Sequence, residues 1–205
     1  MMRLFCFSIF LFFCFSHVIC QDYFSTWSSV QLYHANTARD ASYLSLEEKN
    51  IFLVLNLARI YPQLFNTRIL QKYIGSETGG NDFLKHRKYL KSLSRELSSM
   101  SQLDPVYPSK ELWEYALCHA VNSGKKGVVG HNRYECAAPL FYSECCAYGF
   151  NKAIDIVVQL LIDHNISDLG HRRIMLDSRQ TSLGVSIQYH KKYIYNAVLD
   201  FSFDL

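Results

Sequence analysis

The spacing of hydrophobic residues predicts a helix that begins at residue 45. Ser45-Leu46-Glu47-Glu48 has the form of a capping box, in which a serine and the glutamate three residues later satisfy the first free backbone N–H groups. Apolar residues then recur on one helix face, at Ile51, Val54, Leu55 and Ala58. Pro62 predicts that this helix ends near Tyr61, because the residue before a proline disfavours helical backbone.

Three later segments carry helical spacing: 83–97, 110–122 and 152–163. Ser109 can cap the second, and Ser123-Gly124 is expected to end it. Asn151 can cap the third, which is apolar nearly all round. Its polar residues form one narrow stripe, made by Asp155, Gln159 and Asp163.

The chain closes with two segments of β character, 182–189 and 193–201, joined by His190-Lys191-Lys192. Helices first and a hairpin last predict a mixed α/β (α+β) domain, with helices packed on an antiparallel sheet. Residues 21–44 are aromatic and serine-rich without a clear period. We therefore expect them to be a lead-in segment to a domain that spans 45–205.

The first residues indicate export. A single Arg3 precedes a short apolar run, which is typical of a secretory signal peptide, and Val18 and Cys20 suit cleavage before Gln21. The alternatives are an uncleaved membrane anchor and lipidation of Cys20 after cleavage. With residues 1–20 removed, the mature chain has no stretch long enough to span a membrane. We expect a secreted, extracellular protein, or a periplasmic or cell-surface one if the source is bacterial.

Charge narrows the choice of partner. The net charge is +3, and basic and acidic residues are interspersed along the chain. A nucleic-acid partner is not expected, because such proteins carry a clustered basic face.

Removal of the signal peptide leaves an even number of cysteines, Cys118, Cys136, Cys145 and Cys146. An even number in an exported chain favours disulfides. The adjacent Cys145 and Cys146 are poor partners for each other, so the favoured pairings join this dipeptide to both Cys118 and Cys136. Buried free thiols are the alternative, and a zinc site is a weaker one because no pair of Cys-x-x-Cys motifs is present.

Four polar residues stand beside structural breaks or at the ends of elements: His131, Glu144, Asp163 and His171. Imidazoles and carboxylates are both metal ligands and proton carriers, so the four could form a metal site or an acid–base cluster. Taken singly, each also has an ordinary structural explanation, such as a loop histidine or a solvated carboxylate.

These residues belong to a series of short motifs in a fixed order. They are Asn56-Leu57-Ala58-Arg59 with Pro62, Cys118-His119-Ala120, Gly130-His131-Asn132, Glu144-Cys145-Cys146-Ala147-Tyr148-Gly149, Leu160-Leu161-Ile162-Asp163, Gly170-His171-Arg172-Arg173 and Leu183-Gly184-Val185. Over residues 46–203 this series resembles the CAP superfamily, or SCP-like domain, of cysteine-rich secretory proteins, wasp antigens and plant pathogenesis-related proteins. It looks closest to the shorter bacterial branch.

The resemblance implies a three-layer α-β-α sandwich with a mainly antiparallel central sheet. It also implies a cavity lined by the tetrad His131, Glu144, Asp163 and His171. The Glu-Asn motif of the family is Glu144-Cys145 here, so the amide is absent and a disulfide is expected to brace the loop. Asp163 stands where the family more often has a glutamate, which shortens the reach of the carboxylate by about one methylene.

The resemblance leaves three functions open. The first is an exported domain that binds an apolar ligand, such as a sterol or another lipid, or an extracellular protein partner. The second is a metal-assisted hydrolase, in which water is activated by His131 or His171, with zinc or calcium at the tetrad and Glu144 as base. The third is a structural or effector domain in which the tetrad is polar packing.

Overall fold

The computed structural model describes residues 23–75, 87–140 and 142–203. The predicted signal peptide, 1–20, therefore lies outside the described residues, as does the start of the helix predicted over 83–97. No helix in the described part of the chain is long and apolar enough to cross a membrane.

The centre of the fold is a four-stranded sheet in the order β1-β3-β4-β2. The hairpin of β3 (Ser182–His190) and β4 (Ile194–Ser202) confirms the two strands predicted at the end of the chain. Strand β2 (Tyr142–Tyr148) is antiparallel to β4, and the short β1 (Tyr107–Pro108) is parallel to β3. The sheet is therefore mainly antiparallel, as predicted.

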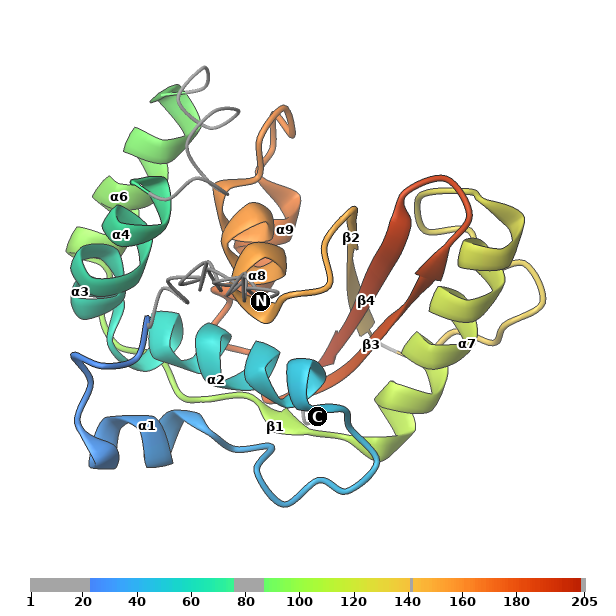
Figure 1. Ribbon diagram of the computed structural model, residues 1–205, viewed down its shortest axis with the longest axis horizontal. Coiled ribbons are helices and arrows are strands. Elements are labelled where there is room, and N and C mark those ends of the chain that lie inside the picture. Colours follow the sequence, from blue (N-terminus) through green and yellow to red (C-terminus); the bar gives the residue numbers. More distant parts are fainter. Residues whose placement is uncertain (1–22, 76–86, 141, 204–205) are drawn as a thin grey trace, which may run out of the picture.

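Helices cover both faces of this sheet (Figure 1). Helix α7 (Lys110–Lys126) packs on one face against β3 and β4. On the other face α2 (Leu46–Ile60) contacts β3, while α8 (Ala153–Ile162) and α9 (Gly170–Met175) contact β2. This arrangement confirms the expected α-β-α sandwich.

The remaining helices lie outside α2 and α8, away from the sheet. They are α1 (Ser29–Ala35), α3 (Pro62–Phe65), the π-helical turn η1 (Asn66–Leu70), α4 (Gln71–Ile74) and α6 (Arg87–Ser99). Within the segment 21–44, which we expected to be a lead-in, the structure shows helix α1. It has its own capping box between Ser28 and Gln31.

The capping box predicted for α2 is confirmed. The Ser45 hydroxyl accepts a hydrogen bond from the N–H of Glu48, and the Ser45 N–H donates to the Glu48 carboxylate. The same carboxylate accepts the N–H of Ile187 at 2.9 Å, which fixes the start of α2 against β3. The helix ends at Ile60, as predicted from the sequence. Pro62 then opens the short helix α3, which was not predicted.

Two predicted helix boundaries are wrong, for tertiary reasons. Helix α7 continues through Gly124 to Lys126 and ends at Gly127, whose φ of 69° is left-handed. Packing requires glycine at position 124, because a Cβ there would lie 2.0 Å from the carbonyl oxygen of Tyr189. Asn151 does not cap α8. Lys152 occupies that position, and Glu47 of α2 accepts the N–H of Ala153 at 3.0 Å.

The first motif of the resemblance has a structural role. The Asn56 amide donates to the carbonyl of Ala35 and accepts the N–H of Val106 at 2.9 Å. The guanidinium of Arg59 is fully buried and donates to backbone carbonyls, among them those of Met175 and Gln180. Both side chains thus join α2 to segments that are distant in sequence.

Candidate functional site

The first histidine–carboxylate pair joins a loop to the sheet. Nδ1 of His131 lies 2.7 Å from Oε1 of Glu144. The Glu144 side chain is 4% exposed on β2, whereas that of His131 is 59% exposed. A buried carboxylate therefore fixes one nitrogen of an imidazole whose remaining surface faces solvent.

The backbone around Gly130 sets the position of His131. Gly130 adopts a φ of 94°, which favours glycine. Its N–H donates to the hydroxyl of Tyr148 at 2.8 Å, and its carbonyl lies 3.1 Å from Nε2 of His119 on α7. The N–H and the carbonyl of Gly130 are thus both held by side chains of the fold, so His131 is presented from a fixed loop.

Arg133 neutralises the buried end of this pair. Its guanidinium donates hydrogen bonds to Glu144 and to Asp200 of β4, and all three side chains are buried. Burial raises the pKa of Glu144, but the His131 hydrogen bond and the Arg133 charge outweigh it, so the pKa is lowered overall. The hydrogen bond with Glu144 raises the pKa of His131. Burial raises the pKa of Asp200 to about 7.

The second pair joins the end of α8 to the start of α9. Nδ1 of His171 lies 2.7 Å from Oδ1 of Asp163, whose other oxygen accepts the N–H groups of His171 and Arg172 at 2.9 and 3.2 Å. Asp163 has a φ of 55°, a left-handed conformation that turns the chain out of α8. The carboxylate that ends one helix therefore binds the first N–H groups of the next, where negative charge is favourable.

The four predicted residues form two pairs, and Cys145, which follows Glu144 in β2, lies near the second pair. Its thiol is 3.8 Å from the carbonyl of His171. Burial raises its pKa, and the charges of Asp163 and Glu144 add to this effect. Strand β2 therefore contributes to both pairs: Glu144 binds His131, and the thiol of Cys145 lies near the backbone of His171.

The predicted cysteine pairing is wrong. The disulfide joins Cys118 of α7 to Cys136, while Cys145 and Cys146 are free and buried. Consecutive residues of a strand point to opposite faces of the sheet, so β2 directs these two thiols into separate environments. The brace therefore acts on the loop that carries His131 and Arg133, rather than on the strand that carries Glu144.

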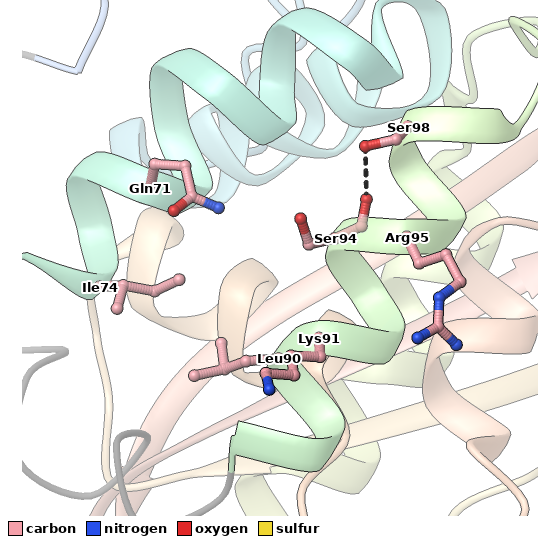
Figure 2. A pocket seen from close by; sticks show the side chains of 7 residues that line it. All are labelled: Gln71, Ile74, Leu90, Lys91, Ser94, Arg95 and Ser98. Carbon is pink, nitrogen blue, oxygen red and sulfur yellow. Dashed lines mark hydrogen bonds between the residues drawn. The ribbon is translucent and has the colours of Figure 1, made fainter.

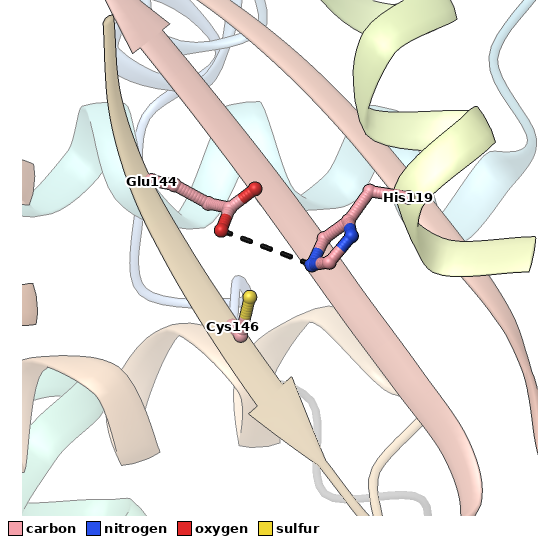
Figure 3. Close-up of side chains that lie close together, drawn as sticks. All are labelled: His119, Glu144 and Cys146. Atoms are coloured by element: carbon pink, nitrogen blue, oxygen red, sulfur yellow. Dashed lines mark ion pairs between the residues drawn. The ribbon is translucent and has the colours of Figure 1, made fainter. Parts of the chain in front are cut away.

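A second cluster shares Glu144 and adds Cys146, which we predicted as a disulfide partner, and His119, to which we gave no role. Donor atoms of His119, Glu144 and Cys146, all buried, lie within 4.8 Å of one another (Figure 3). Burial lowers the pKa of His119 and raises that of the Cys146 thiol. Nδ1 of His119 has no hydrogen-bond partner among the described residues. The motif Cys118-His119-Ala120 was the available signal for His119, but it gives no role to the imidazole.

A pocket of about 390 Å³ lies elsewhere, between α4 and α6 (Figure 2). It is lined by Gln71, Ile74, Leu90, Lys91, Ser94, Arg95 and Ser98. None of the tetrad residues lines this pocket, so it is separate from the two pairs.

No protein-family model, no curated protein and no solved structure matches this chain. The resemblance to the CAP superfamily accordingly remains a proposal, which rests on the motif order and on the two histidine–carboxylate pairs.

Proposed function

We propose that this chain is an exported CAP-like domain whose function is to bind a ligand through the imidazoles of His131 and His171. The main support is that a buried carboxylate holds Nδ1 of each imidazole. Glu144 holds His131, and Asp163 holds His171. This contact fixes the ring orientation and leaves Nε2 as the nitrogen available to a ligand. The spacing of the motifs along the chain supports the same assignment.

The donor atoms of His131, Glu144, Asp163 and His171 favour zinc over calcium as the bound metal. A carboxylate on the far nitrogen of a histidine is the usual support for zinc-bound imidazole. Calcium requires six to eight oxygen ligands, whereas Glu144 is already engaged by His131 and Arg133, and Asp163 by His171. The resemblance assigns the ion to His131 and His171, whereas the donor atoms that lie within 4.8 Å of one another in the described residues are those of His119, Glu144 and Cys146. The ion would supply Lewis acidity to a ligand.

The loop around His131 also offers apolar surface. It exposes Val129, Tyr134 and Leu140, whose residue surfaces are 54%, 54% and 85% accessible. Large exposed apolar residues beside a fixed polar group suit a ligand that has both an apolar body and a polar end, such as a sterol. An extracellular protein partner is the alternative occupant of this loop.

A metal-assisted hydrolase is the second candidate. It is favoured by the ionised Glu144, which lies beside the partly exposed His131 and could orient or deprotonate a water molecule. The described thiols do not suggest a nucleophile, because burial raises the pKa of Cys145 and of Cys146 and disfavours the reactive thiolate.

Zinc titration of the metal-free protein tests the proposed site at His131 and His171. We expect binding that is lost in His131→Ala and in His171→Ala, and retained in the control His34→Ala, which removes an exposed imidazole of α1. Loss in only one of the two variants would contradict a shared site. Turnover of ester or peptide substrates by the zinc-loaded protein would favour the hydrolase over the binding domain.

A fluorescent sterol tests the apolar ligand. We expect Val129→Ser and Leu140→Ser to weaken binding, and Leu46→Ser to leave it unchanged, since Leu46 is a similarly exposed residue of α2. Equal binding by all three variants would remove the loop from the proposed ligand site.

A further inference from the structure

The tip of the β3–β4 hairpin exposes four large apolar side chains within seven residues of sequence. They are Tyr189 at 65%, Tyr193 at 38%, Ile194 at 64% and Tyr195 at 36%. Lys191 and Lys192, in the connecting loop, are exposed as well. A concentrated group of exposed apolar residues on a soluble domain marks a surface that contacts something else.

The backbone at this tip is strained in a way that folding does not require. Ile194 has a φ of 70°, a left-handed conformation that is unfavourable for a β-branched residue. Hairpin loops of this length usually place glycine at such a position. The side chain of Ile194 is mostly exposed, so core packing does not account for isoleucine here. Retained strain of this kind points to a use for the side chain outside the fold.

The tip is also held rigidly. His190 is fully buried, and its Nδ1 accepts the N–H groups of Lys192 and Tyr193 at 3.1 and 3.2 Å. Its proton is therefore on Nε2, which donates to the carbonyl of Val128 at 2.9 Å. Surfaces that are ordered before binding lose less entropy when they bind.

Positive charge gathers around the same tip. The N–H of Lys191 donates to the carbonyl of Gly124 at 2.9 Å, which brings the hairpin loop against the end of α7 (Figure 1). That end carries the exposed Lys125 and Lys126, of which Lys126 pairs with Glu135 at 3.2 Å. The lysines of the two elements thus lie on adjoining segments, and the ammonium of Lys192 lies 5.2 Å from the ring centre of Tyr193.

We propose that the hairpin tip 189–195, together with Lys125 and Lys126, docks this domain on an anionic phospholipid surface. Tyrosine and isoleucine suit the boundary between headgroups and acyl chains, and lysine suits the anionic headgroups. The tip is a projecting turn that presents single side chains, as interfacial anchors do. The tip adjoins the loop of His131, because Tyr193 packs on Tyr148, whose hydroxyl accepts the N–H of Gly130, but it contains no tetrad residue.

Sedimentation with lipid vesicles tests the charge requirement. We expect the exported protein to bind vesicles of phosphatidylcholine mixed with phosphatidylserine, to bind phosphatidylcholine alone poorly, and to be released by salt. Lys191→Glu with Lys192→Glu should weaken binding by about tenfold or more. Lys88→Glu with Lys91→Glu, on the exposed face of α6, is the matched control and should bind normally. Equal binding to neutral vesicles, or none to either, would overturn the proposal.

Ile194→Gly provides a test in which stability and binding change in opposite directions. Glycine relieves the strain at positive φ, so the melting temperature should rise while vesicle affinity falls. Unchanged affinity would exclude Ile194 from the docking surface. Binding to heparin without vesicle binding would point to a soluble polyanion instead of a membrane. His131→Ala should bind vesicles normally. A negative vesicle result would therefore count against the docking surface alone, and not against the proposed ligand site at His131 and His171.

Discussion

Asp200 lies directly opposite Glu144 in the ladder between β4 and β2, and Arg133 donates a hydrogen bond to each carboxylate. Two buried acids thus share one guanidinium. The position of His131 depends on this arrangement, because its partner Glu144 is held from the other side by Arg133.

Arg133→Met should be strongly destabilising. It leaves two buried carboxylates without their cation, and removal of one partner from a buried ion pair costs about 3–5 kcal/mol. Urea unfolding measures the loss, and adding Asp200→Asn should restore part of it. Arg179→Met is the control, because Arg179 makes an exposed pair with Asp177 and should change stability little. A small effect at Arg133 would contradict the shared-guanidinium arrangement.

Asp200 should make stability depend on pH. Its folded pKa of about 7 lies above the ordinary value, so the folded state binds the proton more tightly than the unfolded chain. The stabilisation is complete below pH of about 4 and is lost as pH rises to about 7. His131, whose pKa is also raised, acts in the same direction, while His119, whose pKa is lowered, acts against it. Denaturant midpoints of the wild type and Asp200→Asn isolate the Asp200 contribution. A larger decline with pH in the variant would refute the assignment.

Thiol titration should distinguish the observed disulfide from the pairing that the sequence suggested. In mature protein without residues 1–20, a thiol reagent should label Cys145 and Cys146 only after unfolding, because both are buried and burial raises their pKa values. A protein that shows no free thiol after unfolding would instead have the dipeptide bonded to Cys118 and Cys136.

Reduction of the Cys118–Cys136 disulfide should destabilise the domain by about 3 kcal/mol, the value typical of a loop of this length. Because the closed loop contains His131, reduction should also weaken zinc binding more than Cys145→Ala does. An equal effect of the two changes on zinc affinity would separate the disulfide from the site.

Asp163→Ala should cost about 1–2 kcal/mol, because the N–H groups of His171 and Arg172 lose their acceptor. Asp163→Asn should cost less, since asparagine tolerates the left-handed backbone and keeps an acceptor oxygen. Chemical denaturation of both variants provides the comparison, and equal losses would indicate that the N–H contacts contribute little.

Local signals in the sequence were sufficient for several elements. The Ser45 capping box and Pro62 fixed both ends of α2, and the alternation of the last two segments identified the hairpin. The four residues of the tetrad were named from motif order, since neither imidazole is near its carboxylate in any periodic pattern, but their division into two pairs was not predicted.

Features that depend on tertiary contact escaped prediction. Gly124 is typical of a helix end in the sequence, but it lies inside α7, where the carbonyl of Tyr189 packs against it. The start of α8 is capped by Glu47, which belongs to another helix. The disulfide depends on which faces of α7 and β2 meet, and four cysteines alone do not specify this. Helix α1 is too short for a periodic signal.

The Glu47 contact also limits how far the domain could be shortened. Its carboxylate binds the first N–H of α8 and the ammonium of Lys152, across a separation of more than a hundred residues. The far end of α8 carries Asp163. In a fragment that lacked α2, the first turn of α8 would therefore lose its acceptor and fray. Fraying that extended along α8 would disturb Asp163 and its pair with His171. The smallest autonomous unit that retains both pairs must begin no later than α2.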